Sequence, residues 1–238
     1  MQNCKVEQGG CVNCLKKKFS LLKDLSNKEL ELLDSRRELF DFKKGITIFK
    51  PGEDAKKLLC LNEGAVKICA EDEEGNIQIV DFKKKLDFLG FHELMSEQKY
   101  STSATAINDV SVCAIDKDDF FSIVRNNNDL SMKIIKNLSS SLRISEKRII
   151  KLTQKQMRAR LAGAVLELAD IYGYSKEDKS LINIMIKRKE LANFSNMTTA
   201  NAIRTLSAFN KENLIRTERR KVWITNLKAL KKVQQESS

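Results

Sequence analysis

The spacing of apolar residues changes character along the chain and predicts three kinds of region. Helical spacing of leucines runs from residue 21 to 39, and Ser26 with Glu29 three residues later is a capping box that predicts a helix start. From residue 42 to 115 short apolar runs alternate with polar residues, and glycine-containing turn signals separate them. The clearest runs are residues 46–49, 58–61, 66–69 and 77–80. Several short strands at this spacing predict a small antiparallel barrel or sandwich.

The pattern becomes helical again after Asp118 and then carries a heptad repeat. Apolar residues recur in steps of three and four, with one serine in register: Ile135, Leu138, Leu142, Ser145, Ile149 and Leu152. This repeat favours a two-helix dimer seam on one long helix, and the alternative is a helix packed on its own domain. Ser145 in mid-seam, with Lys147 and Arg148 beside it, would make such a dimer marginal, and a marginal dimer is one that a signal can switch.

The last third predicts two helices around a tight turn, followed by a hairpin. A helical run covers residues 160–172, a short helix residues 187–194, and a second helix residues 198–213. Asn196 can take the left-handed conformation in the turn, and Thr198 is the expected cap of the second helix. Alternating strands at residues 214–217 and 221–225 flank a basic turn. Helix, turn, helix and hairpin in this order predict a winged helix-turn-helix.

Charge separates the same regions. The chain of 238 residues carries a net charge of +11, and residues 151–238 contain 18 Lys/Arg against 8 Asp/Glu. A nearly neutral domain joined to a strongly basic one suggests that the basic part meets a polyanion. The chain has no apolar run near the roughly 18 residues of a membrane helix and no secretory signal, so we expect no membrane partner and a cytoplasmic location. The single histidine, His92, excludes a multi-histidine metal site.

Specific stretches accompany this order of elements. They are RKELA from Arg188, AIRTL from Ala202, Leu214-Ile215 leading into the hairpin, Lys44-Gly45, Ile48-Phe49, Gly52 and EGAVK from Glu63. Together they resemble the Crp/Fnr family of bacterial transcription regulators over nearly the whole chain. The resemblance implies an α+β fold, with a cyclic-nucleotide-binding-like β-roll, a long dimerisation helix and a C-terminal winged helix-turn-helix. The expected divisions are an arm at 1–18, the roll at 19–125, the dimerisation helix at 126–157 and the DNA-binding domain at 158–238.

Within the family, the chain looks most similar to the Fnr branch, at Gly90-Phe91 and at the segment around Cys113 that precedes Asp118-Asp119-Phe120. The resemblance implies an oxygen-sensing [4Fe-4S] cluster on four thiolates, Cys4, Cys11, Cys14 and Cys113. The order in the arm is reversed, since here the single cysteine precedes the Cys-x2-Cys pair. We expect Cys113 at a strand end, and Cys60 and Cys69 as buried structural thiols.

Other signals remain open. The four cysteines could hold zinc, or no metal, and the signal could be haem, nitric oxide or a small molecule inside the roll. Residues 99–104 stand where the cyclic-AMP branch has a phosphate-binding arginine and contain none, so we expect no cyclic AMP. With a cluster, the arm would be tied to the roll beside the long helix, and oxygen would release the arm and weaken the dimer.

The second helix of the motif should read double-stranded DNA in the major groove. Arg204 occupies the family's base-reading position, and Thr198, Thr199 and Asn201 are further candidates for base or phosphate contact. Ile203 and Leu206 are expected to pack in the core. Ala200 and Ile203 replace residues that the family uses to read bases, so the half-site is expected to differ from the usual one. Phosphate contacts are expected from Lys187, Arg188, Lys189, Arg216, Arg219, Arg220 and Lys221.

The resemblance further implies a homodimer on a palindromic operator, contact with RNA polymerase, and activation rather than repression. A regulator with one of the other signals is the serious alternative. An enzyme is a further rival, because a Cys-x2-Cys pair can exchange disulfides. That chemistry needs a βαβ unit, which the pattern does not contain. A roll acting on a protein partner without DNA is a further rival, and the basic C-terminal third argues against it.

Overall fold

The computed structural model describes residues 21–236, which form two compact units. The first unit takes the chain up to Ala70 together with Lys83–Arg143, and the second takes Glu71–Phe82 together with the chain from Ile144 onward. The division at Arg143 and Ile144 falls inside one continuous helix, α5 (Asn128–Gln154). No helix within residues 21–236 combines the length and the apolar character that crossing a membrane requires.

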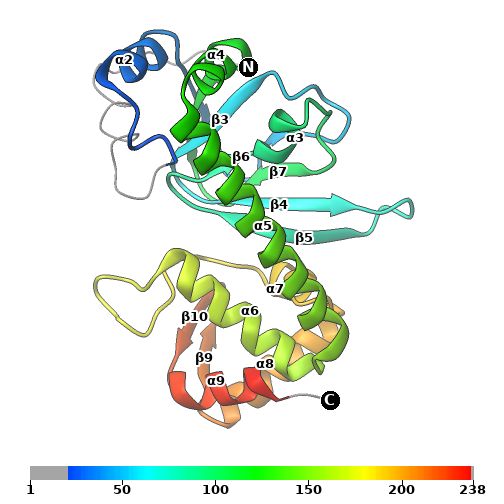
Figure 1. Ribbon diagram of the computed structural model, residues 1–238. Coiled ribbons are helices and arrows are strands. Elements are labelled where there is room, and N and C mark those ends of the chain that lie inside the picture. The colour runs from blue at the N-terminus through cyan, green and yellow to red at the C-terminus, as the bar shows by residue number, and fades with distance from the viewer. Residues whose placement is uncertain (1–20, 237–238) are drawn as a thin grey trace. The chain divides into compact units, whose positions relative to one another are not determined.

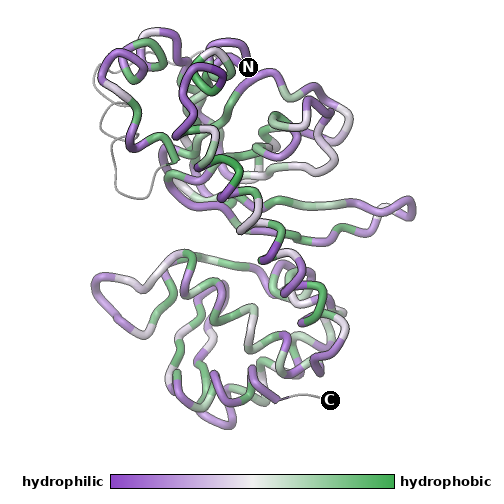
Figure 2. The backbone as a smooth tube through the Cα atoms, viewed as in Figure 1, coloured by the Kyte–Doolittle hydropathy of each residue, from purple (hydrophilic) through white to green (hydrophobic). Residues whose placement is uncertain are grey.

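Two four-stranded sheets make the roll, as the alternating pattern predicts. The order β1-β8-β3-β6 combines β1 (Glu38–Phe42), β8 (Val110–Asp116), β3 (Lys57–Glu63) and β6 (Phe88–Leu89). The order β2-β7-β4-β5 combines β2 (Thr47–Phe49), β7 (Ser103–Ala106), β4 (Val66–Glu71) and β5 (Ile77–Lys83). The turn between β4 and β5 is strongly hydrophilic, as Figure 2 shows at the tip of the hairpin.

Three helices accompany the first of these sheets. They are α2 (Asn27–Ser35), α3 (Phe91–Met95) and α4 (Lys117–Asn126). Helices α3 and α4 pack against β3, α4 also packs against β8, and α2 packs against α4 (Figure 1). Ser26 caps α2 and forms the predicted capping box with Glu29, so this local expectation is confirmed.

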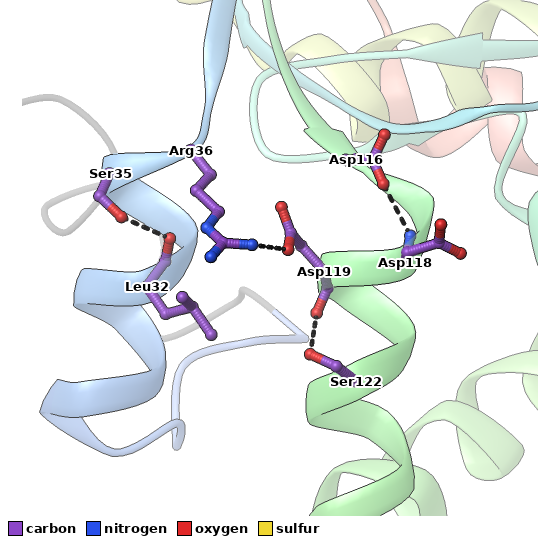
Figure 3. A network of polar contacts seen from close by, with 7 residues as sticks. All are labelled: Leu32, Ser35, Arg36, Asp116, Asp118, Asp119 and Ser122. Atoms are coloured by element: carbon purple, nitrogen blue, oxygen red, sulfur yellow. Dashed lines mark hydrogen bonds and ion pairs between the residues drawn. The ribbon is translucent and has the colours of Figure 1, made fainter.

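A polar network joins α2 to α4 (Figure 3). Arg36, which ends α2, donates from Nη1 to Oδ1 of Asp119 at 2.5 Å. The carboxylate of Asp116 caps α4 by accepting a hydrogen bond from the backbone of Asp118 at 2.9 Å. The start of α4 is therefore fixed both to its own cap and to the end of α2.

The structure requires a glycine at position 90, the first residue of the Gly90-Phe91 pair. Its φ is 62°, and a Cβ at this position would lie 2.2 Å from the ring of Tyr100. That ring stacks on Phe49 with the centroids 3.8 Å apart, so it cannot retreat without breaking the contact. Burial raises the pKa of Tyr100 to about 12. A side chain at position 90 would meet both a strained backbone and an occupied space.

The second unit is built around a helix that is buried along most of its length. α6 (Met157–Tyr172) contacts α7 (Arg188–Phe194), α8 (Thr199–Lys211) and α9 (Leu227–Gln235). The hairpin of β9 (Ile215–Glu218) and β10 (Lys221–Ile224) follows α8 (Figure 1). This order is the predicted winged helix-turn-helix.

Several expectations at element boundaries are wrong. Helical structure ends at Ser35 rather than near residue 39, because Leu39 pairs with Cys113 of β8 and the long-range ladder overrides the leucine spacing. Cys113 lies in the middle of β8, not at a strand end. α6 begins at Met157, three residues before the expected start. The sequence analysis also missed α9, although Asn226 caps it and Leu230 and Val233 are buried.

Candidate functional site

The turn between α7 and α8 is built by local hydrogen bonds. Asn196 has a φ of 51°, which confirms the predicted left-handed residue. The buried hydroxyl of Ser195 donates to the carbonyl of Leu191 at 2.7 Å. Thr198 caps α8, since its Oγ1 accepts a hydrogen bond from the backbone of Asn201 at 3.3 Å. These contacts fix the angle at which α8 leaves the turn.

α8 separates into a buried and an exposed side. Ala202, Leu206 and Phe209 are buried. The exposed positions are Thr199, Ala200, Ile203, Arg204, Ser207 and Lys211. The expectation that Leu206 packs in the core is confirmed, but the same expectation for Ile203 is wrong, because its side chain is 47% exposed. Ile203 lies four residues after Thr199, so the two side chains share one face of the helix. Arg204, the next residue, is exposed on the same side.

Arg204 is held in place on this exposed side. Its Nη2 donates to Oδ1 of Asn201 at 3.0 Å. This bond leaves the other guanidinium donors available, and a guanidinium has five. The structure therefore brings Asn201 and Arg204 together, and Asn201 acts on the orientation of Arg204 in addition to any contact of its own.

The wing is locked to α8 by a reciprocal pair of hydrogen bonds. Nδ2 of Asn210 donates to Oγ1 of Thr217 at 2.9 Å, and the backbone N–H of Thr217 donates to Oδ1 of Asn210 at 3.0 Å. Sequence reasoning missed this clamp. An asparagine near the end of a helix, seven residues before a threonine in a strand, is the only signal that could have found it.

Trp223 supports the wing from β10. Its Nε1 donates to Oδ2 of Asp178 at 2.7 Å, and the guanidinium of Arg216 lies 4.1 Å from the ring centroid. Hydrogen bonds from Ser180 and Trp223 lower the pKa of Asp178, so this acceptor is ionised near neutral pH. Arg219, at the tip of the hairpin, has a φ of 48°. The wing thus presents its arginines from a braced hairpin.

Most of the expected phosphate-contacting cations are exposed. They are Lys187, Lys189, Arg216, Arg219, Arg220 and Lys221. Arg188 differs from them, because its Nη1 is buried without a hydrogen-bond partner and burial lowers its pKa. Lys187 caps α7, and its backbone N–H donates to the carboxylate of Glu190 at 2.8 Å. Two of the exposed cations lie at the start of α7, which precedes α8 in the sequence. The other four lie in the β9–β10 hairpin, which follows α8.

α6 fixes the far end of α8. Arg158 makes a two-pronged ion pair with Glu212, with nitrogen–oxygen distances of 3.0 and 2.7 Å. The pairing raises the pKa of Arg158 and lowers that of Glu212. Bidentate pairs of this kind add geometric specificity as well as energy.

Arg160 joins the end of α5 to the turn of the helix-turn-helix. It donates to the carbonyls of Leu152 at 3.4 Å and Lys155 at 3.2 Å. It also donates to the carbonyls of Ser195 at 3.1 Å and Asn196 at 3.0 Å. One side chain therefore satisfies acceptors in two segments that are about 40 residues apart in the sequence.

A second arginine anchors α5 within the same unit. Arg148 donates to the carbonyl of Val80 at 2.5 Å and lies 4.5 Å from the ring centroid of Phe194. Burial lowers its pKa and raises that of Glu167. Arg148, Arg160 and Glu167 line a cavity of about 260 Å³. The lining is largely apolar, and Arg148 and Arg160 already donate to backbone carbonyls.

The expected dimer seam is exposed where it is most apolar. Ile135, Leu142 and Ile149 are 53%, 63% and 63% exposed. Leu138 and Leu152 are half-buried, and Ser145 is exposed. The seam does not account for every apolar side chain on α5, because Ile144 and Ile150 are also exposed and lie off the heptad positions.

Only one of the four expected cluster ligands can be placed. Cys4, Cys11 and Cys14 lie outside the described residues. Cys113 is 4% exposed and lies directly across from Cys60 in the sheet. Within residues 21–236 no three His, Cys, Asp or Glu side chains converge as a metal site would require. The thiol of Cys113 suits an iron–sulfur cluster chemically, and a complete donor set would need the arm.

Comparisons with known proteins define the class of the molecule. A cyclic nucleotide-binding domain model matches residues 39–127, and a Crp-like helix-turn-helix domain model matches residues 159–233. A roll of the first kind joined to a helix-turn-helix of the second is the architecture of a transcription regulator. The chain belongs to the Crp/Fnr family of transcription regulators.

Individual relatives agree with this assignment. The chain is 25% identical to the fumarate and nitrate reduction regulatory protein of Yersinia pestis, over 95% of this chain and 92% of the relative. It is 24% identical to the anaerobic regulatory protein of Aggregatibacter actinomycetemcomitans, over 95% and 90%. These relatives are regulators rather than enzymes.

Solved structures share the fold. FixK2 of Bradyrhizobium japonicum matches with a TM-score of 0.75 at 20% identity, over 85% of this chain and 99% of that structure. A transcriptional regulator of the CRP/FNR family from Thermus thermophilus matches with a TM-score of 0.71 at 24% identity, over 84% and 100%.

Proposed function

We propose that this regulator binds a palindromic DNA operator as a homodimer, with α8 of each protomer in the major groove. The observation that carries the proposal is the exposed side of α8, where Asn201 holds the guanidinium of Arg204 outward from a braced helix. A guanidinium in this place can donate two hydrogen bonds to guanine O6 and N7. Thr198 and Thr199, at the start of α8, lie where recognition helices meet base edges or phosphates.

The exposed cations of α7 and the wing supply the sequence-independent part of binding. Lys187, Lys189, Arg216, Arg219, Arg220 and Lys221 would neutralise phosphates and set the position of α8 on the duplex. Arg188 is the weakest member of the expected set. Its Nη1 is buried, so it could donate a hydrogen bond to a phosphate oxygen only after the side chain turns outward.

The exposed heptad positions of α5 support dimerisation. A two-fold pairing would bury Ile135, Leu142 and Ile149 against the same residues of a second copy. Ser145 and the neighbouring basic residues weaken this seam. Its pairing equilibrium would therefore respond to a signal worth a few kcal/mol.

For the signal we propose a [4Fe-4S] cluster held by Cys4, Cys11, Cys14 and Cys113. The names of the two relatives above, an anaerobic regulator and a regulator of fumarate and nitrate reduction, support oxygen as the input. When bound, the cluster would supply an oxygen-labile link between the arm and β8. Cys113 would hold that link at the sheet on which α4 packs, and α4 leads directly into α5.

The stretch from residue 99 to 104 contains no arginine for a cyclic phosphate. Between residues 99 and 104, Ser101 donates to the carboxylate of Glu93 at 3.0 Å, and this negative charge would repel a phosphate. We therefore expect no cyclic AMP. A cytoplasmic location, contact with RNA polymerase and an activating role follow from the family and belong to the same proposal.

The DNA proposal is tested by selecting a preferred operator from a random duplex library and measuring binding at several salt concentrations. We expect a palindromic consensus, two protomers per site, and an affinity that falls steeply with salt. Recovery of a single asymmetric site by one protomer would contradict the homodimer.

The cluster is tested separately, on protein purified without oxygen. We expect about four iron atoms and four sulfides per chain, with a visible absorbance that air bleaches. Cys113→Ser should lower the iron content, whereas Cys69→Ser, a change at another buried cysteine, should not. If the protein contained no iron but still bound DNA specifically, the cluster proposal would be wrong and the DNA-binding proposal would stand.

A further inference from the structure

Cys60 and Cys113 lie side by side in the roll. They are directly opposite residues of the antiparallel strands β3 and β8, and the pairs on either side, Leu59 with Ala114 and Leu61 with Val112, keep the same register. Opposite residues of antiparallel strands point to the same face of the sheet, with Cα atoms about 4.5–5.5 Å apart. This separation is within the range of roughly 4.4–6.8 Å that a disulfide spans.

We propose that Cys60 and Cys113 form a reversible disulfide when a peroxide reaches the roll. The two thiols are the central members of a row across the sheet, with Leu39 beside Cys113 and Phe88 beside Cys60. They are only 5% and 4% exposed, so a small, uncharged oxidant is needed. Hydrogen peroxide meets this requirement, whereas a bulky disulfide such as oxidised glutathione does not.

The chemistry balances without any other reactant. One thiol is oxidised by hydrogen peroxide to a sulfenic acid, with release of one water. The second thiol then attacks the sulfenic sulfur, the S–S bond forms, and the hydroxyl leaves as a second water. Two thiols have lost two electrons, and one peroxide has been reduced to two waters. The neighbouring thiol favours this outcome over further oxidation because it is already in place.

Cys69 provides a matched comparison within the same fold. It is also buried in a strand, β4, but the residue directly opposite it is Ser103 of β7. Among residues 21–236 no second cysteine is paired with it across the sheet, so a disulfide with another strand cysteine is not expected there. The two cysteines of the pair therefore differ from Cys69 in their neighbour and not in their burial.

The proposal does not depend on the iron–sulfur cluster. If Cys113 holds a cluster, the disulfide forms only in protein that has lost it. If no cluster exists, the disulfide forms in the protein as isolated. The test therefore uses full-length protein that was purified without oxygen and treated with an iron chelator, so that metal content cannot decide the outcome.

The three buried cysteines fall in separate tryptic peptides, residues 58–67, 68–83 and 100–117, each with a single cysteine. After treatment with hydrogen peroxide, thiols are blocked with N-ethylmaleimide under denaturing conditions and the protein is digested without reductant. We expect a linked pair of peptides 58–67 and 100–117, two hydrogens lighter than their sum, which dithiothreitol separates. Cys69 should stay blocked by N-ethylmaleimide throughout.

Variants sharpen the assignment. Cys69→Ser should form the linked peptide at a rate within about twofold of the wild type, since effects of distant sites are close to additive. Cys60→Ser and Cys113→Ser should not form it, and their remaining thiol should pass to sulfinic acid. Linkage of Cys113 mainly to Cys4, Cys11 or Cys14 would overturn the proposal, as would oxidation of Cys60 and Cys113 to sulfinic acids in the wild type. The peptide analysis of the oxidised wild-type protein tests the disulfide even if a variant fails to fold.

Discussion

Two helices of this protein expose apolar side chains, and their surroundings give those side chains different meanings. α8 exposes one large aliphatic residue, Ile203, between a threonine and the arginine that Asn201 orients. α5 exposes several, of which Ile135, Leu142 and Ile149 repeat at heptad spacing. An isolated apolar side chain in a polar, basic face suits the edge of a base, for example a thymine methyl. A repeated apolar row suits a second copy of the same helix. Periodicity, rather than exposure alone, separates the two proposed functions.

The largest expected effect is on stability, and it distinguishes the buried side of α8 from its exposed side. Leu206→Ala should lower the free energy of unfolding by about 2–5 kcal/mol, because Leu206 is fully enclosed. Ile203→Ala on the same helix should change it by less than about 0.5 kcal/mol. Chemical denaturation of both variants measures the contrast. Equal destabilisation would place Ile203 in the core and remove it from the reading face.

Leu142→Glu tests the α5 side of the comparison. A carboxylate in the seam should separate the protomers and lower the affinity for a palindromic operator about 100-fold, since binding then loses its second contact. Sedimentation velocity and a DNA titration measure the two effects. Ser140→Glu adds the same charge to the opposite side of α5 and is the matched control. A dimer that survives Leu142→Glu would show that the protomers pair through another surface.

Arg204→Ala tests the reading role of α8. It should cost about 1–3 kcal/mol in affinity for the preferred operator and much less for operators that differ at one base pair. Binding to a set of single-substitution operators measures this loss of discrimination. A uniform loss across the set would assign Arg204 to the phosphate backbone instead.

Arg219→Ala should have the smallest effect on DNA affinity. Its loss should be the same for all operators, in contrast to that of Arg204→Ala. The arginine at the tip of the wing should contribute equally to all sequences, so its removal should weaken every operator by a similar factor. The slope of log affinity against log salt should become shallower by about one unit. A sequence-dependent loss would mean that the wing reads the DNA as well as the helix.

Local signals in the sequence were sufficient for much of the fold. Ser26 with Glu29, Asn196 and Thr198 are each recognised within four residues of chain, and all three occupy their expected roles. These features depend on backbone groups that are nearby whatever the tertiary structure does. Alternating strands and the helix-turn-helix order follow from the same short-range information.

Features that depend on long-range pairing could not be predicted in this way. Nothing near Cys60 indicates that Cys113 is opposite, because the register of β3 and β8 is set by the whole sheet. The clamp between Asn210 and Thr217 depends on how α8 meets the wing. Ile203 was assigned to the core by its residue type, whereas its position on α8 decides its exposure. The ligands in the arm lie outside the described residues, so their part in the site stays a prediction.

The four carbonyls gathered by Arg160 have a mechanical consequence. Its rigid, planar head group connects the final turn of α5 with the bend that precedes α8. A twist of the final turn of α5 would therefore displace that bend through one side chain. A single guanidinium would therefore couple the end of α5 to the start of α8.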